Sequence, residues 1–163
     1  RCVSVRCGIA RPGPRTRIGI VACGAFLIGG CMSDTHKVSD CFSQPPENHG
    51  HPGSISRVIM GPGARRDDRP AALDTERLVI HTNEYEPFGM SGDGHAHPDQ
   101  EQAFYILEGD IEVEVGDETY RLGPGDCVLL PRNVFHKHRN IGDTPLKFLF
   151  ISAMLGAGKA PGG

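Results

Sequence analysis

Apolar and polar residues follow the two-residue period of β-strands over most of the chain. The run Ile111–Val115 alternates without a fault, which predicts a strand with three β-branched residues on one face and two Glu side chains in water. Further short apolar or alternating runs, bounded by Gly-, Pro- or Asp-rich turns, are 55–60, 77–82, 102–107, 119–122, 127–130 and 147–151. No run of ten or more residues keeps the 3.6-residue period of a helix. The pattern therefore predicts an all-β sandwich or barrel.

Composition agrees with one small domain. The chain has 163 residues, of which 38% are hydrophobic, enough for one modest core. Its 22 Gly and 13 Pro fit many short strands joined by turns. The net charge is −3 and the main body holds no block of like charge, so a nucleic-acid groove is not expected.

Residues 1–31 differ from the rest, because they contain five Arg, no acidic residue and four of the six Cys. Three interpretations are open: a translated upstream segment before a start at Met32, a lipoprotein-type signal with Cys31 as the lipidated residue, and a transit-like leader. The apolar run 18–28 is shorter than the roughly 20 residues of a membrane span, so no span is expected. All three interpretations place residues 1–31 outside the fold.

The remaining chain divides into three parts. Residues 32–53 are polar and rich in Pro and Gly, which predicts a flexible linker or arm with His49 and His51 in solvent. Residues 54–155 carry the strand pattern and are the expected barrel domain, and residues 156–163 are an expected flexible tail. Few cysteines in the body favour a cytoplasmic location, with a lipid-anchored or exported protein as the alternative if 1–31 is a real signal.

Three histidines stand where strands are expected. His95 and His97 are two residues apart, so on a strand both rings leave the same face. His136 follows a later turn and also adjoins an expected strand. Three neutral imidazoles and one oxygen donor suit one divalent transition metal ion, which could be Fe, Mn, Ni, Co, Cu or Zn.

Two longer patterns contain these histidines. Residues 89–109 resemble the first cupin motif, which is Gly, five residues, His-x-His, three or four residues, an acidic or amide ligand, six residues and Gly. Residues 125–140 resemble the second, and fifteen residues separate the two. The chain is thus similar to small single-domain cupins of the quercetin-dioxygenase-like kind. The resemblance implies a double-stranded β-helix jelly-roll barrel that holds a metal ion with His95, His97, His136 and a fourth ligand.

The sequence departs from the family pattern at two points. Asn133 replaces the second glycine of the second motif, where a left-handed turn is needed that Asn tolerates. The fourth ligand is Gln102 if counted from Gly109 and Glu101 if counted from His97. Strand parity puts these two side chains on opposite faces, and we favour Gln102 with Glu101 as the alternate. A Gln ligand would leave the ion its full charge, which favours an anionic or bidentate oxygen substrate.

The other candidates have plainer expectations. Phe104, Ile106 and Phe135 are expected to line or floor the pocket. His138 is expected on the outer rim rather than as a ligand. The Cys127 thiol is expected to be buried and inert. Three more polar residues are expected to be ordinary strand or loop residues: His81, Tyr85 and Glu86.

For function, the resemblance implies a metal-dependent enzyme acting on a small oxygen-rich substrate, with a dioxygenase placed ahead of an isomerase or lyase. The alternative is a non-catalytic cupin that binds a small sugar or acid. No residue outside the two motifs is a clear proton donor or acceptor for catalysis. The family also implies a homodimer formed through edge strands.

Overall fold

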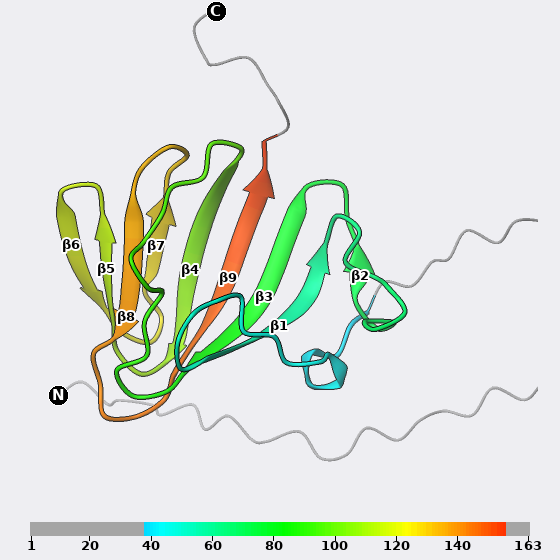
Figure 1. Cartoon of the computed structure of the whole chain (residues 1–163), viewed down its shortest axis with the longest axis horizontal. Helices are drawn as coiled ribbons and strands as arrows, with labels where there is room; N and C mark the ends of the chain where they lie inside the picture. The colour runs from blue at the N-terminus through cyan, green and yellow to red at the C-terminus, as the bar shows by residue number, and fades with distance from the viewer. Residues whose placement is uncertain (1–37, 156–163) are drawn as a thin grey trace, which may run out of the picture. The chain divides into compact units, whose positions relative to one another are not determined.

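The computed structural model describes residues 38–155, and within them the chain is built from strands (Figure 1). Apart from one short 3₁₀ turn, η1 (Cys41–Ser43), the described elements are β1 (Ser54–Gly61), β2 (Leu73–Asp74), β3 (Leu78–Tyr85), β4 (Gln100–Glu108), β5 (Ile111–Val115), β6 (Glu118–Leu122), β7 (Cys127–Leu130), β8 (His136–Asn140) and β9 (Leu146–Met154). The all-β prediction is confirmed. The interpretations of residues 1–31 and 156–163 lie outside the described residues.

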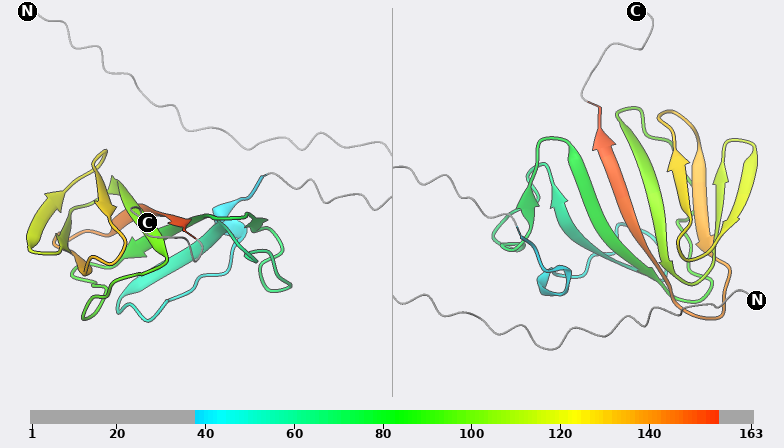
Figure 2. Two further views of the ribbon diagram at one scale, coloured as in Figure 1. Left: turned by 90° about the horizontal axis from the view of Figure 1, so that it is seen from above. Right: turned by 180° about the vertical axis from the view of Figure 1, so that it is seen from behind.

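The strands form two sheets. The larger has the order β2-β1-β3-β9-β4-β7 and the smaller the order β6-β5-β8, and Figure 2 shows them from above and from behind. All of their pairs are antiparallel except β1 with β2. The loop before β4 covers the free edge of β8 through isolated bridges of Met90 with Arg139 and of His95 with His136. This loop carries the first motif onto the strand of the second.

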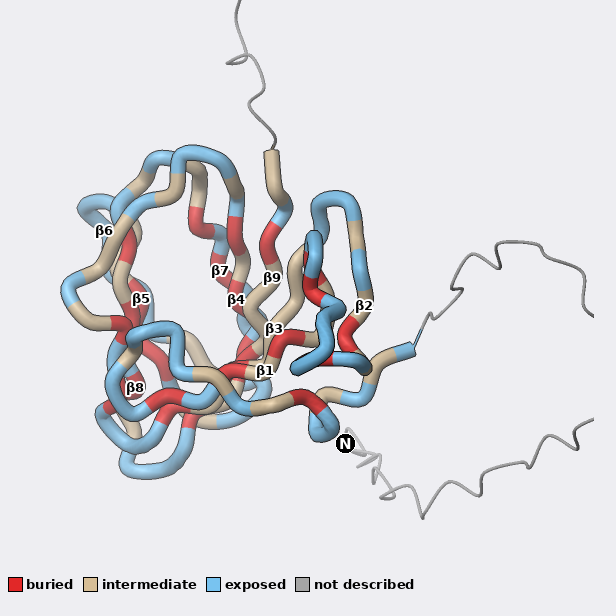
Figure 3. The backbone as a smooth tube through the Cα atoms, turned by 45° about the vertical axis from the view of Figure 1, so that its right-hand side comes forward, coloured by how far each residue is buried: buried red, intermediate tan, exposed pale blue. Residues whose placement is uncertain are grey.

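Alternation along the strands creates the core. In β4 the side chains of Gln102, Phe104 and Ile106 are buried, while Glu101 and Tyr105 are exposed. Figure 3 shows this alternation as red and pale blue segments along the backbone. The buried apolar residues of the main cluster are Tyr85, Phe104, Ile106, Ile111, Val113, Val128, Leu130, Leu146 and Phe148. One face of each sheet thus closes on the interior.

Two predictions about side-chain exposure are wrong. Cys127 is exposed, because β7 is the edge of the larger sheet and buries only Val128 and Leu130. Glu112 is only 8% exposed, and burial along β5 does not alternate: Ile111 and Val113 are buried too, and Glu114 and Val115 are both intermediate. The Glu112 carboxylate accepts hydrogen bonds from Arg121 Nε (3.1 Å) and Arg139 Nε (2.8 Å), since both arginines stand directly opposite it on the flanking strands.

The polar segment before β1 packs on the barrel. Glu47 and Ser56 exchange two backbone hydrogen bonds of 2.7 Å each, and Gly53 O accepts one from Glu86 N at 2.8 Å. Gln44 is only 2% exposed. The expectation of a free linker therefore does not hold for residues 44–53. Among the described residues, no helix has the length and apolar character to cross a membrane.

Candidate metal centre

The backbone brings the three motif histidines together. His95 and His136 exchange two backbone hydrogen bonds, of 2.9 and 2.8 Å, in an isolated antiparallel bridge. His97 O accepts a bond of 2.8 Å from Asn133 N, which ties the first motif to the turn before β8. As a result, one ligand atom from each of the three imidazoles lies within 4.8 Å of the others. The His-x-His pair lies in a bridged loop rather than in the expected strand.

The two ring nitrogens of His136 have the surroundings expected of a metal ligand. Its Nδ1 lies 3.0 Å from Val134 O, so Nδ1 carries the proton and donates it to the carbonyl. Its Nε2 is buried and has no hydrogen-bond partner. Burial lowers the pKa of the His136 imidazole, which favours the neutral ring with a free lone pair on Nε2. A metal ion would satisfy this orphaned nitrogen.

Two special backbone positions shape the loops. Gly94 has φ +85°, and a Cβ there would lie 2.6 Å from Phe135 Cζ and 2.8 Å from His136 O. Only glycine therefore fits beside His95. Asn133 has φ 62°, so the left-handed turn expected at this replaced glycine is present.

Gln102 and Glu101 leave opposite faces of β4. Gln102 is 4% exposed and lines the same cavity as the three histidines. Glu101 is exposed and does not line it. Of the two candidates for a fourth ligand, only Gln102 therefore lines the cavity that contains the three histidines.

The cavity holds about 620 Å³. It is lined by all seven histidines of the described residues, which are His49, His51, His81, His95, His97, His136 and His138. Phe104 lines it too, whereas Ile106 is fully buried in the core cluster and is not part of the lining. Phe135 was expected in the lining, but it is 46% exposed and its ring packs over Gly94 instead.

A second polar group in the cavity, the Tyr85 cluster, consists of Tyr85, His51 and His138. The Tyr85 hydroxyl lies 2.7 Å from His51 Nδ1 and 2.8 Å from His138 Nε2. His138 is buried, and its Nδ1 has no partner, so the outer-rim expectation is wrong. Tyr85, expected in a loop, ends β3 and is 1% exposed. The shared parity of His138 with His136 on β8 was the signal for its inward direction, whereas nothing periodic marks His51.

Burial keeps these groups uncharged. Burial, with smaller contributions from neighbouring histidines and, for His81, from Arg69, lowers the pKa of His138 to about 3 and that of His81 to about 4. Burial also lowers the pKa of His51 and His97 and raises that of Tyr85. Neutral imidazoles can coordinate a metal or accept and donate hydrogen bonds, but they supply no positive charge at pH 7.

Comparison with known proteins identifies the family. The cupin domain family matches residues 82–152. The uncharacterised protein MJ1618 of Methanocaldococcus jannaschii is 32% identical over 100 residues, which are 61% of this chain and 73% of that protein. The tetracenomycin polyketide synthase protein TcmJ of Streptomyces glaucescens is 28% identical over 102 residues, covering 59% of this chain and 68% of that one. The chain belongs to the cupin family.

Solved structures agree on the fold. A predicted oxalate decarboxylase from Thermotoga maritima superposes with a TM-score of 0.60 at 19% identity, covering 73% of this chain and all of that one. At this identity the likeness shows a cupin fold and no particular activity. Several other curated relatives are matched over only 36–51% of their length.

Proposed function

We propose that this cupin binds one divalent transition metal ion and uses it on a small oxygen-rich molecule in the cavity. The observation that carries the proposal is the buried, unpartnered Nε2 of His136 beside the ligand atoms of His95 and His97. Gln102, from β4, is the proposed fourth ligand. Because all four donors are neutral, the ion would keep its full double charge and attract an anionic or bidentate oxygen ligand.

For the reaction, we propose a dioxygenase first. A redox-active ion at this centre would allow a bound substrate to react with dioxygen, whereas any divalent ion would polarise a carbonyl or enolate. The chain's own residues would orient the substrate: Phe104 and Phe150 would give it apolar contacts, and Tyr85 and His51 would offer hydrogen bonds. The names of the matched proteins span a polyketide synthase and a predicted oxalate decarboxylase, so they do not select the reaction.

The Tyr85 cluster supports a second candidate, an isomerase or lyase. Such reactions need a group that moves a proton, and the Tyr85 hydroxyl between two imidazoles is suited to that task. Oxygen uptake during turnover separates the two candidates. A dioxygenase consumes dioxygen with substrate, whereas an isomerase or lyase turns over equally well without it.

Metal binding is tested on the full chain purified without an affinity tag, by elemental analysis after incubation with each candidate metal. We expect about one ion per chain in the unaltered protein and in His49→Ala, because His49 lines the cavity outside the cluster of three histidines. We expect His136→Ala and His136→Gln to lose the ion while keeping the β-type circular dichroism spectrum. Equal metal content in all four proteins would contradict the proposed centre, and a protein that never takes up metal would favour a binding cupin without turnover.

A further inference from the structure

Over the part of the chain that the structure describes, the cavity lining contains no Asp, Glu, Lys or Arg. Five lysines and arginines around the barrel are paired with carboxylates instead: Arg57–Glu84, Arg69–Glu47, Lys137–Glu114, Arg139–Glu112 and Lys147–Glu108. A phosphate or second carboxylate on a ligand, placed away from the metal centre, would thus be buried without a compensating charge, which is unfavourable.

Rings form a continuous row along the cavity from the buried His138 to the exposed His49. Centroid distances are 4.8 Å from His138 to Phe104, 6.2 Å from Phe104 to Phe150, 5.2 Å from Phe150 to His81 and 5.3 Å from His81 to His49. Each of these distances is typical of interacting aromatic pairs. The rings come from β8, β4, β9, β3 and the segment before β1, so the row crosses the larger sheet and begins beside the metal centre.

Neutral polar side chains of the cavity are suited to hydroxyl groups. Tyr85, Asn83 and Gln100 line the cavity on the same faces of β3 and β4 as the rings and offer neutral donors and acceptors. The volume of about 620 Å³ lies in the about 300–1,000 Å³ range of sites for drug-sized ligands and is far more than a two-carbon acid fills. Size, neutrality and the row of rings together favour a flat ligand with several hydroxyls.

We propose that the cavity binds a planar, hydroxylated aromatic molecule, with one oxygen at the metal centre and its ring system against the row formed by His138, Phe104, Phe150, His81 and His49. The position of the oxygen rests on the proposed function, whereas the position of the rings rests on the contacts above. Dicarboxylates and phosphorylated sugars are correspondingly poor ligands.

The test measures binding of 2,3-dihydroxynaphthalene to the full chain by its fluorescence, with oxalate and glucose 6-phosphate as competitors, in metal-loaded and chelator-treated protein. Phe150→Leu removes a half-buried ring of the row and keeps an apolar side chain. Its matched control is Tyr105→Leu, on the outward face of β4. We expect Phe150→Leu to raise the Kd by about two- to tenfold in both forms, the range given by the loss of one aromatic contact. Tyr105→Leu should leave the Kd unchanged, and both variants should keep the metal content of the unaltered protein.

The outcomes separate the two proposals. The probe could bind equally with and without metal while Phe150→Leu still weakens its binding. That result would contradict the position of a ligand oxygen at the metal centre and support the row of rings as the ligand site. If Phe150→Leu binds as tightly as Tyr105→Leu, the row is not the ligand site. Displacement of the probe by oxalate or glucose 6-phosphate at lower concentrations than the probe's own Kd would also overturn the assigned ligand class.

Discussion

Gln102 and Glu101 are neighbours with opposite surroundings, and their separation decides the charge of the metal centre. Gln102 stands beside Leu130 on β7 and Ser152 on β9, on the face that closes the cavity. Glu101 stands on the other face and is exposed. If Gln102 is the fourth ligand, the ion has no carboxylate partner, which strengthens its attraction for an anionic oxygen.

This assignment predicts a graded loss of metal affinity. Gln102→Ala should weaken affinity on the order of tenfold, because a neutral amide oxygen is the weakest donor of the four, and His97→Ala should weaken it more strongly. Glu101→Ala should change it little, because its side chain faces solvent. Competition with a chelating dye measures all three. A stronger loss in Glu101→Ala than in Gln102→Ala would show that the shorter motif spacing is the real one.

The buried neutral His81 predicts that metal-free protein becomes less stable in acid. The folded pKa of about 4 lies below the ordinary 6.5, so below pH 6.5 the unfolded chain binds the proton that the folded chain refuses. The stabilising contribution is therefore complete above pH 6.5 and is lost as the pH falls toward 4, by up to about 3 kcal/mol. Urea unfolding of the unaltered protein and of His81→Gln from pH 8 to pH 4 measures this. We expect a smaller loss in the variant, and parallel curves would contradict it.

The direction of single side chains was predictable only where a strand pattern fixed it. Parity on β4 placed Gln102 and Phe104 in the cavity from the sequence alone. The same rule applied to β8 puts His138 on the same face as His136, whereas the family pattern assigns His138 no ligand role and favours the rim. For Phe135 no parity was available, because it precedes β8 and its direction follows from the close approach to Gly94.

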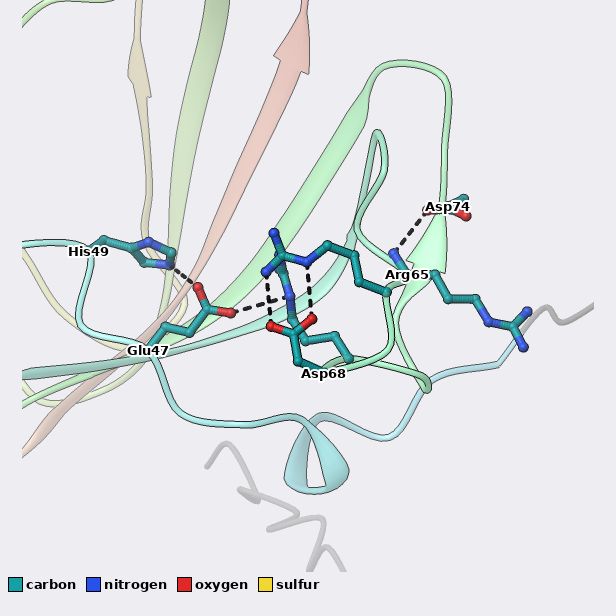
Figure 4. A network of polar contacts seen from close by, with 7 residues as sticks. Glu47, His49, Arg65, Asp68 and Asp74 are labelled. Carbon is teal, nitrogen blue, oxygen red and sulfur yellow. Dashed lines mark hydrogen bonds and ion pairs between the residues drawn. The ribbon is translucent and has the colours of Figure 1, made fainter.

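Among the elements, the segment before β1 is one whose packing on the barrel could not be predicted from the sequence. It has no periodic pattern, and its position depends on contacts with residues far along the chain. Glu47 joins it to the barrel: its carboxylate lies 3.3 Å from Arg69 Nε and 3.9 Å from His49 Nε2, as Figure 4 shows for Glu47 and His49. Arg69 is only 7% exposed. The same holds for residues 64–76, which are charged and poor in apolar residues, a composition that predicts an exposed loop. This stretch contains β2 and the buried Ala72.

The buried Arg69 predicts that the Glu47 carboxylate stabilises the fold. Glu47→Gln removes the negative charge and leaves the guanidinium uncompensated, which should lower the free energy of unfolding by about 1–3 kcal/mol. Glu101→Gln makes the same chemical change at an exposed site and should stay within about 0.5 kcal/mol of the unaltered protein. Urea unfolding followed by circular dichroism compares the two. Equal stability of the two variants would show that solvent, not Glu47, satisfies Arg69.

For the whole molecule, the outer face of the larger sheet is notable because it carries exposed apolar side chains that no other described element covers. Antiparallel register aligns Leu129, Ala103, Ile151 and Ile80 in one row across β7, β4, β9 and β3. Leu129 is 58% exposed and stands on β7, an edge strand of the sheet. An edge strand with exposed apolar side chains favours pairing with another chain, which agrees with the homodimer implied by the family resemblance.

A homodimer formed through the β7 edge predicts that a charged side chain at this edge separates the two chains. Light scattering at micromolar concentration should give the mass of two chains, and Leu129→Glu should give that of one, because a carboxylate buried in an apolar interface is unpaired. Ile55→Glu is the matched control: Ile55 is 43% exposed but lies on β1, two strands away from β9 on the side opposite β4 and β7. It should leave the mass unchanged. Circular dichroism of both variants should keep the β-type spectrum, since neither side chain belongs to the core cluster. A monomeric unaltered protein would contradict the dimer, and dissociation by Ile55→Glu alone would move the interface to the opposite end of the sheet.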